Sequence, residues 1–209
     1  PVILSDQNLF ISAEFPGAMA ERIEEALGAD CLPMFLQGAA GDLDPHDSTS
    51  GTNGFYRVRQ AGRDLAEEAL RVADALTPGE NASMRVHPRI MAVPERAAGR
   101  YAAVSTLTVM LNADTAIAAI PGEPFVRHQL DLRERTPFPN AFLLGLAYSG
   151  GATPFTIYLP TVQAAREGGY GASEATFLAA QSGEWILDGV VRAMHELNGT
   201  SVWGRVYHV

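Results

Sequence analysis

Apolar residues recur at helical spacing in four parts of the chain. A first helix is predicted from Pro16, its first residue, to Gly28, which ends it. A third, short helix is predicted over residues 124–134. The clearest helix has Ser182 as its expected N-cap and ends before Gly199. The second helix, between the first and the third, is marked by the apolar positions Ala61, Leu65, Ala69, Val72 and Leu76.

Apolar runs of strand length lie before and between these helices and near the end of the chain. The continuous run at 31–37 is typical of a strand buried on both faces. Helices and strands alternate without strict βαβ regularity, which predicts an α/β or α+β fold with a mixed sheet flanked by helices. We expect residues 1–209 to form one domain. The predicted strands cover residues 10–15, 31–37, 84–93, 105–111, 115–120, 141–147 and 202–209, with a hairpin turn at 111–114.

Composition and charge exclude some classes of function. The chain is 47% hydrophobic and 19% charged, which argues against global disorder. Its formal net charge is −9 and no cluster of Lys and Arg is longer than a pair, so we expect no nucleic-acid partner. No apolar run reaches the length of about 20 residues that a transmembrane helix needs. Cys31 is the only cysteine and is predicted to be a buried small hydrophobe.

Four short segments combine turn-forming residues with an acid or a phenol. They lie at residues 37–45, 121–124, 158–161 and 168–170, and three of them follow apolar stretches. Loops at the ends of strands are where a rigid scaffold commonly carries its chemistry. The acids and phenols of these segments are therefore candidate site residues.

The acids in these segments each have two interpretations. Asp42 and Asp44 lie beside glycines that let the backbone approach a ligand, and they could orient a metal ligand or a water molecule. The same residues also suit a tight turn that needs Gly and Asp for its own geometry. Glu123 follows an apolar strand, where a carboxylate can bind a cation such as Zn²⁺. Glu123 would equally suit a cap on the third predicted helix.

The phenols and histidines are also open to two interpretations. A phenol near a metal, such as Tyr158 or Tyr170, can ligate it or donate to a developing oxyanion. Either tyrosine is also typical of a half-buried core aromatic. The histidines show no metal-ligand spacing such as H-x-x-x-H. His46 adjoins the first of the four segments, and His128 lies one turn into the third predicted helix, where it could stand behind a site at Glu123.

The order of these segments resembles the neutral/alkaline non-lysosomal ceramidases and their uncharacterised bacterial relatives. Residues 9–14 are similar to the family's "LISSD" segment, residues 35–45 to its "GDAGDVSP" or "QGAAGDVNP" loop, and residues 119–123 to its "PGE" motif. Residues 145–147, 158–161 and 169–170 are similar to its "GYAN…GYVTT…NYEG" run. The family shares the twelve-residue step from Tyr158 to Tyr170.

The resemblance implies a zinc-dependent hydrolase of an amide bond, in a ceramide-like N-acyl lipid of sphingolipid metabolism or in another amide. It makes Glu123 and Tyr158 zinc ligands, and Tyr170 the donor to the oxyanion of the tetrahedral intermediate. Asp44 stands where ceramidases carry a serine close to the zinc-bound water, and a carboxylate there would orient the water or bind a cationic group of the substrate. An acid nearby, with Asp42 and Asp44 as candidates, would pass the proton to the leaving amine.

The family's two zinc-binding histidines lie upstream of the segment at 9–14. The nearer one stands 14 positions before the final acid of that segment, which falls immediately before Pro1. The resemblance therefore implies that residues 1–209 are the C-terminal portion of a ceramidase-like catalytic domain. Its partner in the site would be the N-terminal segment of the same protein, which carries the histidine ligands.

Two other classes of function fit the same observations. A non-catalytic ceramidase-like domain that binds a lipid or a partner chain would also lack the histidines and the serine. A serine- or threonine-dependent hydrolase would need no zinc, but the sequence offers no catalytic triad.

Overall fold

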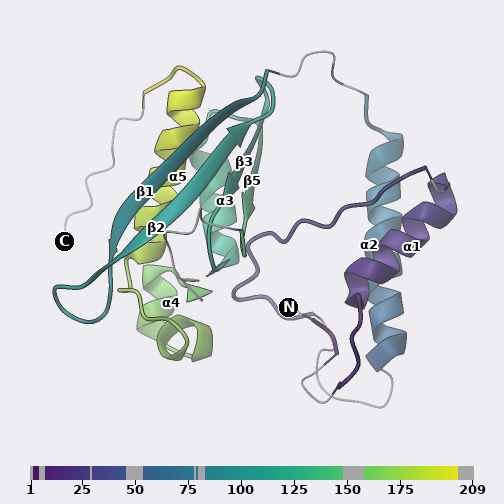
Figure 1. Ribbon diagram of the computed structural model, residues 1–209, viewed down its shortest axis with the longest axis horizontal. Coiled ribbons are helices and arrows are strands. Elements are labelled where there is room, and N and C mark those ends of the chain that lie inside the picture. Colours follow the sequence, from purple (N-terminus) through teal and green to yellow (C-terminus); the bar gives the residue numbers. More distant parts are fainter. Residues whose placement is uncertain are drawn as a thin grey trace. The chain divides into compact units, whose positions relative to one another are not determined.

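A computed structural model describes residues 2–4, 8–28, 30–45, 54–77, 79, 83–147 and 158–201 of the chain. Contacts divide the chain into two compact units, which we describe separately. The first unit comprises Pro1–Leu36 and Asp44–Glu80, and the second comprises Gln37–Leu43 and Asn81–Val209. Figure 1 shows the helices and strands of both units, coloured along the sequence. The assignment of residues 1–209 to one domain stays a prediction.

The first unit is built on two helices, α1 (Glu14–Leu27) and α2 (Gly54–Asp74), which pack against each other. Small residues bring the two backbones close together. A Cβ atom on Gly62 would lie 2.5 Å from Ala18 Cβ, so only glycine fits at this crossing. Val58 and Ala66 lie on the same face of α2 and are buried with Gly62. The α1–α2 pair is therefore held by a close approach of small side chains.

The second predicted helix is confirmed as α2, but its predicted apolar face is wrong. Leu65, Val72 and Leu76, which marked that face in the sequence, are exposed. The face around Gly62 is buried instead, because two helices can approach closely only where the side chains are small. The periodicity of the large apolar residues indicated a helix but pointed to the wrong side of it.

The strand predicted over residues 10–15 does not form. Glu14 and Phe15 belong to the first turn of α1, and residues 10–13 are irregular. The Glu14 N–H donates a hydrogen bond to Ser12 Oγ at 3.0 Å, which satisfies one of the free amides at the start of the helix. Ser12 therefore serves the start of α1, and this part of the sequence leads into a helix and not a strand.

Residues 31–37 form no strand either. Leu32 and Met34 are 87% and 79% exposed, and Cys31 is partly exposed, not buried as predicted. At the end of the run, the Gly145 N–H donates to the backbone oxygen of Gln37 at 3.1 Å. A continuous apolar run indicates burial but does not specify a neighbouring strand. The described residues do not supply a ladder for this one.

The second unit contains a mixed four-stranded sheet, which confirms the predicted fold class. Strand β2 (Tyr101–Met110) pairs antiparallel with β1 (Arg85–Pro94) and with β3 (Thr115–Ala119), and β3 pairs parallel with β5 (Asn140–Leu144). The predicted turn at 111–114 joins β2 to β3, and the Asp114 N–H donates to Asn112 Oδ1 at 2.9 Å. The sheet order is β1, β2, β3 and β5.

Two helices pack with this sheet and enclose the core. Helix α5 (Ser182–Leu197) packs against β1 and β2, and α3 (Val126–Arg135) packs against β5 and α5. Alternate residues of β2 are buried, as expected for a sheet with one covered face. The core includes Val104, Ala118, Leu132, Leu143, Val190 and Met194. No described helix is both long and apolar enough to cross a membrane.

Helix α5 begins at the predicted place, but Ser182 is not its N-cap. Gln181 takes the cap position, and Ser182 is the first helical residue. The Ser182 hydroxyl donates to the Pro94 oxygen at 3.0 Å, so it ties the start of α5 to the end of β1. Gly199 follows the helix with a φ of 72°, as predicted for a residue just beyond a C-terminus. The strand predicted over 202–209 and His46 lie outside the described residues.

Two leucines on α3 test how the helix is placed against the core. Leu132 is fully buried, whereas Leu130 is 42% exposed. We expect Leu132→Ala to lower the free energy of unfolding by about 2–5 kcal/mol, because it removes buried methyl groups and leaves a cavity. The matched control Leu130→Ala should cost less than about 1 kcal/mol. Urea unfolding followed by circular dichroism measures both, and equal losses would contradict this packing.

Candidate functional site

A two-residue ladder brings two of the predicted site residues together. Strands β4 (Glu123–Pro124) and β6 (Tyr158–Leu159) pair in parallel, with Glu123 opposite Tyr158 and Pro124 opposite Leu159. Successive side chains of a strand point to opposite faces. Pro124 and Leu159 are buried, so Glu123 and Tyr158 share the other face and are half-buried there. The ladder therefore presents a carboxylate and a phenol side by side.

Tyr170 lies against Tyr158. Their ring centroids are 5.7 Å apart and their planes meet at 73°, an edge-to-face contact. Tyr170 begins the single-turn π-helix η1 (Tyr170–Glu174), which directly follows Gly169 with a φ of 103°. A Cβ atom on Gly171 would lie 3.1 Å from Tyr158 Cδ1, so this glycine lets the turn close onto the ring. The structure thus brings Glu123, Tyr158 and Tyr170 into one cluster.

The loop at residues 37–43 packs onto β4. The Gly41 N–H donates to the Pro124 backbone oxygen at 2.9 Å, and a Cβ atom on Gly41 would lie 2.3 Å from the backbone oxygen of Glu123. Asp42 Oδ1 accepts a hydrogen bond from the Val126 N–H at 2.7 Å. Asp42 therefore caps α3 from a distant loop, and its charge is favourable beside the helix N-terminus. Glu123, which the sequence offered as a cap on this helix, stays in β4, and Asp42 provides the cap instead.

Glu123 carries an electrostatic cost in the described structure. Burial raises the pKa of the Glu123 carboxyl above its ordinary value, because its charged form loses solvation. The ion pairs among the described residues do not include Glu123. A cation beside this carboxylate would replace the lost solvation. The half-buried carboxylate is therefore suited to bind a cation.

An open cleft of about 530 Å³ adjoins Tyr170 in the second unit. Its lining is mostly polar or glycine, with Phe125 as an aromatic wall. Arg127 at this cleft is paired with Asp131 at 2.6 Å. Asp42 and Glu167 add carboxylates, so the cleft has charged groups of both signs. Such a lining suits a ligand that carries polar groups.

The fit of a zinc ion can be tested on the donor atoms present. Glu123 and Tyr158 provide two oxygen donors on one face, a set that suits zinc but is incomplete, because zinc in proteins is commonly four-coordinate. Within the described residues, no group of three or more His, Cys, Asp or Glu could hold a metal ion. The pair therefore fits part of a zinc site, and further ligands have to come from other residues.

Two more predicted site residues are Asp42, which lines the same cleft as Tyr170, and Asp44. Asp44 is exposed and belongs to the first unit, so its place beside a zinc-bound water stays a prediction. The roles given to Glu123, Tyr158, Tyr170 and Asp42 also stay predictions, although the first three are now neighbours. His128 is buried behind the ladder, on the first turn of α3.

The segment that follows Tyr158 is held by residues that the sequence analysis did not identify. Thr161 Oγ1 accepts from the Ala164 N–H at 3.1 Å and caps α4 (Val162–Glu167), which Gly168 ends. A capping threonine followed by glycine seven residues later is a local signal that predicts this helix. Glu184 Oε1 accepts from the Val162 N–H at 2.7 Å. No local pattern indicates that contact, because the two residues belong to different elements.

The shifted pKa of Glu123 gives a stability test. A raised pKa means that the folded chain holds this proton more tightly than the unfolded chain does. The resulting stability is complete below the unfolded pKa and is lost as the pH rises through the folded pKa. We therefore expect Glu123→Gln to be more stable than the wild type at pH 7 in metal-free buffer. The difference should disappear below the ordinary carboxyl pKa of about 4.3.

Urea unfolding at pH 7 and at pH 4 measures this difference. Glu167→Gln removes an exposed carboxylate at the same cleft and controls for the loss of one negative charge. A difference between Glu123→Gln and the wild type that grows towards low pH would contradict the desolvation of Glu123.

Two solved structures are similar to the chain. A neutral ceramidase from Pseudomonas aeruginosa matches with a TM-score of 0.72 over 98% of this chain, at 13% identity. A ceramidase complexed with C2 matches with a TM-score of 0.75 over 100% of this chain, at 12% identity. The chain spans 45% and 46% of the length of these proteins. No protein-family model and no curated protein matches the sequence. The resemblance is confirmed at the level of the fold, and the chain has the fold of part of a neutral ceramidase.

Proposed function

We propose that the chain supplies part of the active site of a zinc-dependent hydrolase of an amide bond. The pairing of Glu123 with Tyr158 in the β4–β6 ladder, with Tyr170 packed on Tyr158, carries this proposal. Two similar solved structures are ceramidases, and the chain spans less than half of each. The remaining ligands are histidines in the N-terminal part of the same protein.

Glu123 and Tyr158 hold the metal in this proposal. Their shared face fixes two oxygen donors next to each other, and the buried Pro124 and Leu159 prevent either strand from turning them away. Bound zinc supplies Lewis acidity, which lowers the pKa of the attacking water towards about 7 and polarises the amide carbonyl. The desolvation of Glu123 favours cation binding, because a cation restores the electrostatic compensation that burial has removed.

Tyr170 donates a hydrogen bond from its hydroxyl to the oxyanion that forms when water attacks the amide carbon. A phenol hydroxyl can donate a hydrogen bond to such an oxygen. Tyr170 is 67% exposed and lines the open cleft, so a substrate can reach it. The contact with the Tyr158 ring fixes its position beside the ligand pair. A donor fixed in this way stabilises charge that develops in the transition state.

Asp42 and Asp44 handle protons and water in this proposal. Asp42 uses Oδ1 to cap α3, while Oδ2 makes no hydrogen bond to a described residue. Asp42 also lines the cleft, so its second oxygen can pass a proton to the leaving amine. Asp44 orients the water or binds a cationic group of the substrate. The substrate is a ceramide-like N-acyl lipid or another amide.

Removal of either oxygen donor should weaken zinc binding by the whole gene product. We expect Glu123→Gln and Tyr158→Phe each to lower zinc affinity by at least about 10-fold, because each removes a zinc ligand. Loss of a contact that only supports a ligand already lowers metal affinity by about that factor. Glu167→Gln, which changes a carboxylate of the cleft outside the ladder, should bind zinc as the wild type does. Competition with a chelator, followed by metal analysis, measures all three.

Wild-type affinity in both ladder variants would exclude this pair as ligands. A wild-type protein that binds no zinc would favour the non-catalytic alternative, a ceramidase-like domain that binds a lipid or a partner chain.

Tyr170→Phe should lower turnover by about 10²–10³-fold, because it removes one donor to the oxyanion. Folding should be unchanged, since the hydroxyl lies on an exposed residue. Tyr101→Phe is the matched control: Tyr101 is 63% exposed, lies on β2, and should not affect turnover. Initial rates on an N-acylsphingosine and on a panel of other N-acyl amides measure the effect. Wild-type turnover by Tyr170→Phe would remove Tyr170 from the mechanism.

A further inference from the structure

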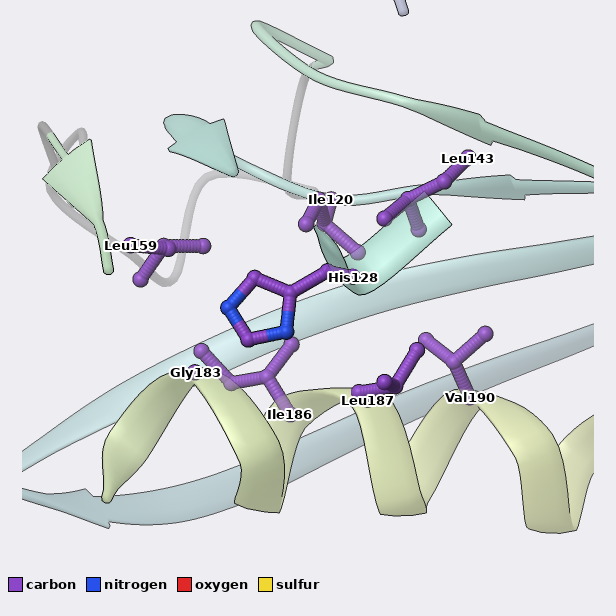
Figure 2. A pocket seen from close by; sticks show the side chains of 8 residues that line it. All are labelled: Ile120, His128, Leu143, Leu159, Gly183, Ile186, Leu187 and Val190. Carbon is purple, nitrogen blue, oxygen red and sulfur yellow. The ribbon is translucent and has the colours of Figure 1, made fainter. Parts of the chain in front are cut away.

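His128 is buried in an apolar pocket behind the β4–β6 ladder. Only 2% of its surface is exposed, although it is the third residue of α3 and the helix itself is largely polar. Figure 2 shows the imidazole ring between Leu159 and the first turn of α5. The pocket is too tight to hold a water molecule. Besides His128, the pocket is lined by Ile120, Leu143, Leu159, Gly183, Ile186, Leu187 and Val190.

The ring makes one hydrogen bond, and its partner fixes which nitrogen carries the proton. His128 Nε2 lies 3.3 Å from the Pro160 oxygen. A carbonyl oxygen can only accept, so Nε2 carries the hydrogen and donates it. His128 Nδ1 is buried and has no partner among the described residues. Within the described part of the chain, one buried ring nitrogen is therefore unsatisfied while the other bonds to Pro160.

Helix α5 closes over this bond. A Cβ atom on Gly183 would lie 2.6 Å from His128 Nε2 and 2.6 Å from the Pro160 oxygen. Both are closer than real Cβ contacts, and the Pro160 oxygen belongs to the backbone and cannot rotate away. Next to Gly183, Glu184 accepts the hydrogen bond from the Val162 N–H. The start of α5 and the His128 ring together hold the turn that follows Tyr158.

We propose that His128 is a positioning residue that sets Tyr158 against Glu123. His128 lies on the helix that continues from β4, and Pro160 lies on the segment that continues from β6. The bond between them therefore fixes the two continuations to each other, next to the Phe125 N–H that donates to the Leu159 oxygen at 3.1 Å. This inference rests on the proposed function, because Glu123 and Tyr158 are the ligands whose separation it fixes.

Two substitutions of His128 separate the donor from the volume it fills. His128→Leu fills the pocket but cannot donate, whereas His128→Gln places an amide N–H near the position of Nε2. Gly183→Ala disturbs the same contact from the other side. Gly189→Ala is its control on the same helix, because a Cβ atom there would meet Met91 Sδ on a flexible side chain that can move aside.

Two measurements on the whole gene product read the result. The first is hydrogen exchange of the Phe125 amide in zinc-free protein, which reports the β4–β6 junction without any metal. The second is zinc affinity. We expect His128→Leu and Gly183→Ala to speed this exchange about 10-fold or more, and to weaken zinc binding about 10–100-fold, the usual effect of losing a contact behind a metal ligand. His128→Gln and Gly189→Ala should stay within about threefold of the wild type in both.

Each other outcome has a definite meaning. Wild-type exchange and wild-type zinc affinity in His128→Leu would overturn the proposal. Equal losses in His128→Leu and His128→Gln would also overturn it, because the ring would then act by packing and not as a donor. If exchange follows the expected order while the wild type binds no zinc, His128 positions the ladder and the proposed zinc function is what fails.

Discussion

The candidate site depends on a ladder of two residues on each strand. An isolated pair of short strands is marginal in water, so β4 and β6 cannot hold Glu123 opposite Tyr158 by themselves. They stay paired because their second residues, Pro124 and Leu159, are buried in the core of the second unit. A slip of one residue would move the carboxylate and the phenol into that core. The position of the two polar side chains is thus fixed by the apolar residues beside them.

Glycines make the close packing around this ladder possible. Gly41 lets the loop at 37–43 bond to Pro124, Gly171 lets η1 approach the Tyr158 ring, and Gly183 lets α5 reach the Pro160 oxygen. In each case an added Cβ atom would meet a backbone oxygen or an aromatic ring at 3.1 Å or less. The segment that contains Gly171 directly follows Gly169, which has a positive φ. The segments that contain Gly41 and Gly183 do not follow such a glycine. The glycines at these three positions are therefore needed for space more than for backbone freedom.

The regular elements of residues 84–147 and helix α5 could be predicted from the sequence, because alternation and helical spacing are local properties of the chain. The failures come from contacts that a local pattern does not contain. The run at 31–37 indicates burial but does not specify which strand would pair with it. The buried face of α2 lies at Gly62, not at the larger apolar residues, because α1 packs closely against it. The order of the motifs predicted that Glu123, Tyr158 and Tyr170 belong to one site. The cap that Asp42 provides to α3 depends on two segments far apart in sequence, and so no pattern within either one could show it.

The neighbourhood of the ladder gives up stability in two ways. Glu123 loses solvation without an ion-pair partner among the described residues, and His128 buries an unsatisfied nitrogen. Unsatisfied hydroxyls at Thr106 and Thr108 on β2 show that such atoms also occur away from the ladder. His128 differs from them because its second nitrogen bonds to the turn after Tyr158. A leucine in this pocket would remove the unsatisfied nitrogen but would leave the buried Pro160 oxygen without this donor. The histidine at this position therefore favours a fixed geometry of the turn after Tyr158 over the stability of the core.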